Sequence, residues 1–177
     1  MIHLIFDNET TGLVLHPAAK DCNQPRIIEW GGLLVNEKGE ELGELDLLIN
    51  PGIPLSPQIV KITGITDDDL RDAPLFAECI TQIHKMFAAA EVLIAHNLPF
   101  DHRMMELDLA RSGASEGWPW PRLNICTVQE HAEEFGHRPK LTELYEHYTG
   151  HPLAQSHRAL DDVRALKTVC MAAGVLK

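Results

Sequence analysis

Three apolar runs in the first fifty residues constrain the fold most, because each is long enough to form a buried strand. They span residues 2–6, 27–35 and 42–49. Between the second and third runs, residues 36–39 (Asn-Glu-Lys-Gly) carry the turn formers of a hairpin. The sequence therefore predicts a sheet that begins with three consecutive strands.

The rest of the chain alternates between helical and strand patterns. Apolar residues recur at helical spacing from Phe76 to Phe87, and Pro99 stands where the first turn of a helix tolerates proline. Proline-rich residues 50–57 and 118–121 are predicted loops. The remaining predicted elements are strands at residues 92–95 and 123–126, and helices at residues 99–111, 128–135, 141–148 and 159–172. This pattern favours an α/β sandwich with a mixed sheet. With no internal repeat or linker, we expect residues 1–177 to form a single domain.

Composition excludes several classes of protein. No apolar run is long enough to cross a membrane, and no signal peptide precedes the first strand. The four cysteines, Cys22, Cys79, Cys126 and Cys170, include no CxxC pair. We therefore expect reduced thiols in a cytoplasmic protein that does not contact membranes.

The net charge raises a question about ligands. The chain has 15 basic and 26 acidic residues, a net charge of −11. A protein that grips nucleic acid through a broad basic surface is not expected to have this balance. Either the chain does not bind nucleic acid, or bound cations carry the attraction locally.

The first group of acids follows residues 2–6. Asp7 and Glu9 are one residue apart, and Thr10, Thr11 and Gly12 come next. Residues i and i+2 of a strand project from one face, so the two carboxylates can offer oxygen ligands to a metal. Taken alone, however, an acidic pair among turn formers is more simply a solvated turn.

Two more acidic signals occur at helix starts. Asp101 falls in a first helical turn, where the helix dipole alone would favour a carboxylate. Near the C-terminus, Asp162 lies on the apolar stripe of its helix, whereas Asp161 lies on the charged side. An inward carboxylate needs a counter-charge or a metal. His157, in the loop just ahead of this helix, is then a candidate general base.

Together these motifs resemble a known family. The segments Asp7-x-Glu9, His96-Asn97-x-x-Phe100-Asp101 and His157-Arg158-Ala159-x-x-Asp162 are similar to the three motifs of the DEDDh (DnaQ-like) 3′–5′ exonucleases. That family includes the proofreading subunit of bacterial replicative polymerases. The resemblance runs from residue 2 to about residue 172, and residues 25–29, 62–66 and 141–144 agree with it. It implies an RNase H-like fold, a five-stranded mixed sheet with helices on both faces.

The resemblance also implies an active site. The four acids would hold two Mg²⁺ or Mn²⁺ ions, with Asp7 contacting both. Glu9 and Asp162 would bind the ion nearest the attacking water, and Asp101 would help to hold the other. His157 would take the proton from the water. The expected reaction releases nucleoside 5′-monophosphates from the 3′ end of a nucleic acid, with single-stranded DNA favoured. Two divalent ions would also answer the question that the net charge raises.

Further residues are expected to contact the substrate. By resemblance, the backbone at Thr10 and Thr11 meets the terminal nucleotide, Leu13 wedges against its base, and Asn97 belongs to the same set. Phe100 either stacks on a base or fills the core. Trp118 and Trp120 are expected to pack within their loop. Basic residues that can assist, although most are expected to be solvated, are Arg103, Arg122, Arg138, Lys140 and Arg158.

The sequence leaves the substrate and the biological setting open. The same chemistry serves exoribonucleases that trim RNA, although Glu9-Thr10-Thr11 is more like the proofreading branch than the Glu-Met-Thr of oligoribonucleases. A non-catalytic binding module on the same fold and a plain acidic metal-binding protein are two further interpretations. The sequence does not separate a free-standing, phage-encoded or repair nuclease from one with a polymerase partner. The loop at residues 14–24 is long enough to influence substrate choice.

Overall fold

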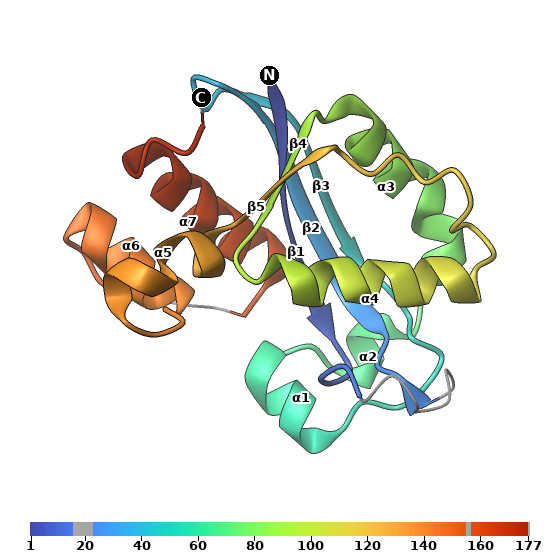
Figure 1. Cartoon of the computed structure of the whole chain (residues 1–177). Helices are drawn as coiled ribbons and strands as arrows, with labels where there is room; N and C mark the ends of the chain where they lie inside the picture. Colours follow the sequence, from blue (N-terminus) through green and yellow to red (C-terminus); the bar gives the residue numbers. More distant parts are fainter. Residues whose placement is uncertain (16–22, 155–156, 177) are drawn as a thin grey trace.

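A central sheet organises the computed structural model, which describes residues 1–15, 23–154 and 157–176 (Figure 1). The strand order is β3-β2-β1-β4-β5. The strands are β1 (Ile2–Thr10), β2 (Ile27–Asn36), β3 (Glu41–Leu48), β4 (Val92–Ala95) and β5 (Leu123–Cys126). β1 pairs antiparallel with β2, as does β2 with β3, whereas β1–β4 and β4–β5 are parallel. The predicted five-stranded mixed sheet is confirmed.

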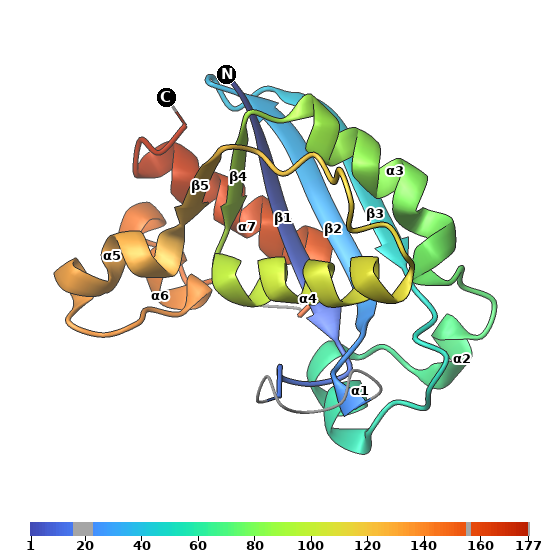
Figure 2. The same ribbon diagram turned by 45° about the vertical axis from the view of Figure 1, so that its right-hand side comes forward.

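Helices cover both faces of this sheet, as predicted. They are α1 (Pro57–Thr63), α2 (Asp67–Leu70), α3 (Phe76–Ala89), α4 (Leu98–Arg111), α5 (Thr127–Phe135), α6 (Leu141–Thr149) and α7 (Ala159–Ala172). Figures 1 and 2 show α3 and α4 on one face and α7 on the other, with α5 and α6 beside α7. Among the described residues, no helix combines the length and apolarity that crossing a bilayer requires.

The alternation of β1 divides the core into two layers. Leu4 and Phe6 pack in the layer under α3 and α4 with Trp30. Ile5 packs in the opposite layer with Val163 of α7. Because successive side chains of a strand point to opposite faces, Asp7 and Glu9 continue the α7 face of β1. Their orientation follows directly from the apolar pattern that precedes them.

Strand β1 is longer than the sequence indicated. The apolar run ends at Phe6, but pairing with β2 continues, with Asp7 opposite Gly31 and Glu9 opposite Glu29. Both acids therefore lie within the strand rather than in a turn after it. Ladder pairing with β2 overrides the turn preference of these residue types.

Helices α1 and α2 were not predicted, because the prolines near α1 indicate a loop. Pro57 instead occupies the first turn of α1, where its missing N–H costs nothing. The Ser56 hydroxyl caps this turn by accepting from the Ile59 N–H at 3.3 Å. Gly64 ends the helix with a left-handed φ of 71°.

Other sequence expectations concern loops and cysteines. Trp118 is buried, and its ring centroid lies 5.4 Å from that of Phe87 in α3, so this loop packs against the helix rather than only within itself. Cys79, Cys126 and Cys170 are buried free thiols. Cys22 and most of the 14–24 loop lie outside the described residues.

Candidate active site

A close approach between β2 and α7 positions the site. Gly31 lies opposite Asp7, and a Cβ at residue 31 would be 2.5 Å from the Leu160 backbone nitrogen and 2.7 Å from the Ala159 carbonyl carbon. Any larger residue would push α7 away, so glycine lets the first turn of α7 lie directly on the sheet. This contact brings Asp162, in that first turn, toward Asp7 and Glu9.

Glu29 fixes the start of α7 in place. It is fully buried, and its Oε2 accepts from the Ala159 N–H at 2.9 Å. Its Oε1 accepts from the Arg158 Nε at 2.8 Å, so this arginine is held at the site rather than free in solvent. Arg158 makes no side-chain cap of its own, and Glu29 satisfies an N-terminal amide of α7 in its place. Sequence reasoning missed this role, although an acid inside an apolar strand run is a usable signal.

Glu9, His157 and Asp162 converge in space. One potential ligand atom from each lies within 4.8 Å of the others. Asp162 is 8% exposed, whereas the Asp161 side chain is 56% exposed, as the helical periodicity predicts. His157 directly precedes the Arg158 cap of α7, and its φ of 51° is left-handed. Histidine is among the few residue types enriched there, and such backbone strain clusters at functional sites.

Asp101 approaches from the opposite side of β1. The pairing of β4 with β1 extends only to Ile5 and Ile94, so the last residues of β1 have no strand partner on their β4 edge. Helix α4 fills that edge, and the Asn8 N–H donates to the Asp101 Oδ1 at 3.2 Å. Asp101 is 2% exposed. The carboxylate thus replaces a missing strand partner and lies next to Asp7.

The carboxylates of the site are hard to ionise. Burial, followed by the charge of the neighbouring carboxylates, raises the pKa of Asp7 to about 7 and that of Glu9 to about 9. Burial, followed by the field of Asp7, also raises the pKa of Asp101 well above its usual range. Within the described chain, neither Asp7 nor Glu9 forms an ion pair, and the guanidinium of Arg158, whose charge acts on Glu9, pairs with Glu29.

These side chains fit a divalent cation. Carboxylate oxygens with an imidazole suit Mg²⁺ and Mn²⁺, and a cation would supply the missing counter-charge. Glu9, His157 and Asp162 form the candidate metal site, with Asp7 and Asp101 at its border. The five residues that the sequence singled out are therefore brought together.

A cavity of about 530 Å³ opens beside Glu9. It is lined by Thr10 at the end of β1, by Thr11 and Leu13 just after that strand, by α1, and by Phe100. Leu13 is 79% exposed, and Phe100 is half-buried, with one side against the core. The two threonine hydroxyls hold the turn itself, since Thr10 Oγ1 donates to the Gly12 carbonyl at 2.7 Å and Thr11 Oγ1 accepts from the Arg26 N–H at 3.0 Å.

Asn97 lies elsewhere. It lines a second cavity, which His157 also lines. Its Oδ1 accepts a hydrogen bond from the Arg138 guanidinium at 2.9 Å. Unlike Thr10, Thr11, Leu13 and Phe100, it has no contact with the cavity beside Glu9.

Comparison with known proteins decides the family. The RNase_T family model, described as Exonuclease, matches residues 4–170. The chain belongs to the RNase_T exonuclease family. It is 35% identical over 170 residues to DNA polymerase III subunit epsilon of Treponema pallidum, which covers 94% of this chain and 71% of that protein.

Other relatives of this chain are much longer proteins. Over 162 residues it is 31% identical to the PolC-type DNA polymerase III of Caldanaerobacter subterraneus, covering 92% of this chain but 11% of the polymerase. The chain spans between 6% and 25% of the length of several such relatives.

The solved structure of exonuclease I has the same fold, with a TM-score of 0.75 and 21% identity over 98% of this chain and 40% of that one. The predicted RNase H-like fold is confirmed.

Proposed function

We propose that this exonuclease removes nucleoside 5′-monophosphates from the 3′ end of single-stranded DNA with the help of two divalent metal ions, Mg²⁺ or Mn²⁺. The observation that carries the proposal is the convergence of Asp7, Glu9, Asp101, Asp162 and His157 at the end of β1. Four carboxylates grouped beside one imidazole are costly to ionise away from water, and such clusters are typical of functional sites.

Each residue has a proposed task. Asp7, Glu9, Asp101 and Asp162 would hold the ions, which would lower the pKa of bound water and neutralise charge on the phosphodiester. His157 takes the proton of the attacking water, and its location ahead of α7 leaves the ring next to Glu9 and Asp162. Glu29 and Arg158 keep the start of α7, and thus Asp162, in position.

The cavity beside Glu9 accepts the 3′-terminal nucleotide. Its walls offer the apolar side chains of Leu13, Ile59 and Phe100, which suit the flat face of a base. Thr10 and Thr11 line this cavity together with Glu9, and we expect the terminal sugar to lie against their backbone. The named relatives include subunits of DNA polymerase III, which supports DNA as substrate and a polymerase or repair complex as partner. We treat residues 1–177 as one catalytic domain.

One assay tests the proposal. The same base sequence is offered as 5′-labelled single-stranded DNA, duplex DNA and single-stranded RNA, with Mg²⁺, Mn²⁺ or EDTA. We expect a ladder that shortens from the 3′ end of single-stranded DNA, and no product in EDTA. A circular single strand and a 3′-phosphorylated strand should resist.

Three results contradict parts of the proposal. Faster loss of the RNA ladder would identify an exoribonuclease. Cleavage of the circle would identify an endonuclease. Binding without cleavage in both metals would identify a non-catalytic module.

A further inference from the structure

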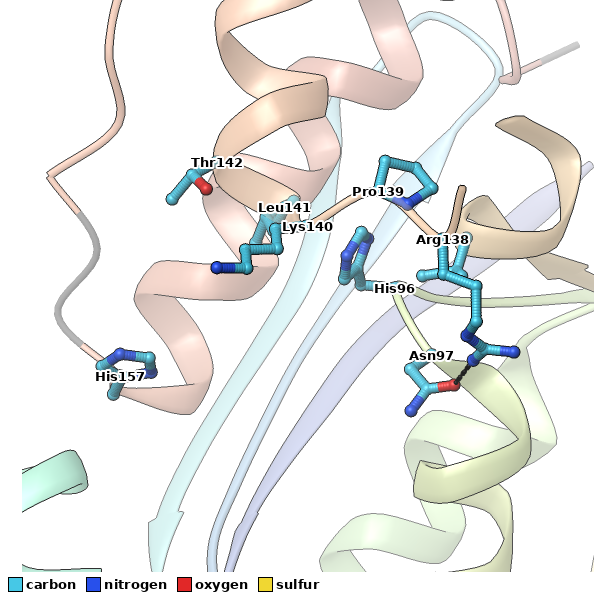
Figure 3. Close-up of a pocket in the computed structure, with 9 residues that line it drawn as sticks. His96, Asn97, Arg138, Pro139, Lys140, Leu141, Thr142 and His157 are labelled. Atoms are coloured by element: carbon cyan, nitrogen blue, oxygen red, sulfur yellow. Dashed lines mark hydrogen bonds between the residues drawn. The ribbon is translucent and has the colours of Figure 1, made fainter. Parts of the chain in front are cut away.

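The second cavity, of about 560 Å³, lies on the other side of the acids from the nucleotide cavity. Four separate parts of the chain form it: the residues just before α4, the first turn of α5, the loop before α6 with the start of that helix, and His157 just ahead of α7. Its polar lining residues are His96, Asn97, Arg138, Lys140, Thr142 and His157. Figure 3 shows His157 at one end of this group, Asn97 and Arg138 at the other, and Lys140 between them in that view.

The charge of this cavity is opposite to that of the whole chain. No carboxylate lines it among the described residues, although the chain has 26 acidic and 15 basic residues. Arg103, Arg158 and Arg164 each pair with a carboxylate, whereas Arg138 and Lys140 form no ion pair within the described parts of the chain. Burial lowers the pKa of His96 to about 4, so that ring is neutral and Arg138 and Lys140 supply the positive charge.

Hydrogen bonds hold the residues that line the second cavity in place. The Arg138 guanidinium donates to Asn97 Oδ1 at 2.9 Å, which ties the α5–α6 loop to the start of α4. Next to it, His96 Nδ1 lies 3.1 Å from the Thr127 hydroxyl. Glu143, the acid nearest in sequence, accepts from the Lys140 backbone N–H at 2.7 Å and contacts the His137 ring at 3.0 Å. That carboxylate is therefore already engaged by other groups.

We infer that Arg138 and Lys140 bind the phosphodiester that lies immediately 5′ to the one being cleaved. This inference rests on the exonuclease function proposed above. A strand with its last nucleotide in the cavity beside Glu9 passes its scissile phosphate at the acids. The preceding nucleotides then extend past His157 into the second cavity, where they meet the positively charged side chains of Arg138 and Lys140. Arg138 and Lys140 thus anchor the retained strand and set how short a substrate can be.

The test compares two substrates in the double variant Arg138→Gln/Lys140→Gln. For a single-stranded oligonucleotide, we expect KM to rise about tenfold with kcat nearly unchanged, because two charged contacts to phosphate are lost. For the p-nitrophenyl ester of thymidine 5′-monophosphate, which has no preceding nucleotide, KM should stay the same. The salt dependence of oligonucleotide binding should weaken by about 0.7 in slope, the value for one phosphate neutralised on a single strand. Lys140→Gln alone keeps the Arg138–Asn97 bond and should show part of the effect.

The matched control is Lys38→Gln/Lys85→Gln, which removes two exposed cations far from the cavity and equalises the change in net charge. An equal rise of KM in this control, or an unchanged oligonucleotide KM in the test variant, overturns the inference. So does an equal loss on both substrates. Anisotropy of a labelled oligonucleotide with Ca²⁺ measures the same anchoring without cleavage. Wild-type protein that binds the oligonucleotide but hydrolyses neither substrate contradicts the proposed exonuclease function and leaves the anchoring measurable.

Discussion

At the scale of single residues, α7 separates two acids that are adjacent in the chain. Asp162 is turned toward Glu9 and His157, whereas Asp161 is exposed and lies 3.9 Å from Arg164. The substitution Asp162→Asn should therefore abolish hydrolysis, and Asp161→Asn should leave most of it. Both remove one negative charge, so each controls for the other in a steady-state assay. Full activity in the Asp162 variant would mean that this carboxylate is not a metal ligand.

His157 has two candidate tasks at the same place, because its ring is close enough to Glu9 and Asp162 to be a ligand or a base. If it is the base, His157→Ala should lower kcat by about 10²–10⁴-fold and leave the affinity for Mn²⁺ nearly unchanged. Calorimetric titration of Mn²⁺ into both proteins distinguishes the two. Loss of metal together with activity would make the histidine a ligand, and retention of both would assign the proton to another group.

At the scale of elements, the close approach of α7 to the sheet depends on Gly31, which has no side chain. Gly31→Ala would place a Cβ 2.5 Å from the backbone of Leu160, so α7 must shift and carry Asp162 and the Glu29 contact with it. We expect a loss of stability of about 1–3 kcal/mol, as overpacking typically costs, and a loss of kcat. Denaturant unfolding and the nuclease assay measure these separately.

The control is Gly43→Ala in β3. There the new Cβ would meet only Leu34, at 3.6 Å, which is an ordinary contact. That variant should retain both stability and activity. Equal behaviour of the two alanine variants would contradict the idea that Gly31 positions α7.

Local periodicity predicted the elements that carry one apolar stripe, and it failed where another element supplies the decisive contact. The helix over residues 159–172 was placed correctly because its stripe is unbroken, and the inward direction of Asp162 followed from it. The extension of β1 to Thr10 could not be predicted, because pairing with β2 decides it. The role of Glu29 could not be predicted either, because its partner, the Ala159 N–H at the start of α7, is distant in the sequence. The proline that starts α1 was interpreted as a loop signal because proline serves both purposes.

At the scale of the whole molecule, the buried carboxylates of the site lower the free energy of unfolding as pH rises. A carboxylate whose pKa is raised by folding binds protons more tightly in the folded protein than in the unfolded chain. Between the ordinary pKa near 4 and the raised pKa, the folded state holds more protons, so the free energy of unfolding falls as pH rises. For Asp7 this window ends at about 7, and for Glu9 at about 9. A bound divalent cation replaces the protons and removes the penalty.

The melting temperature in EDTA should therefore fall between pH 5 and pH 8.5, and Mn²⁺ should raise it more at the higher pH. Glu9→Gln replaces a carboxyl that is ionised in the unfolded chain at pH 8.5 but resists ionisation in the folded protein. The variant should therefore make the metal-free protein more stable at pH 8.5 by several degrees, since about 1 kcal/mol corresponds to about 2–4 °C in a chain of this size. Asp161→Asn is the matched control, because it removes an exposed charge from the same neighbourhood. Thermal unfolding of the three proteins at both pH values, with and without Mn²⁺, gives the comparison. If Glu9→Gln melts below the wild type in EDTA at pH 8.5, the Glu9 carboxylate stabilises the metal-free fold. That result would contradict the idea that this buried carboxylate is kept for metal binding at a cost in stability.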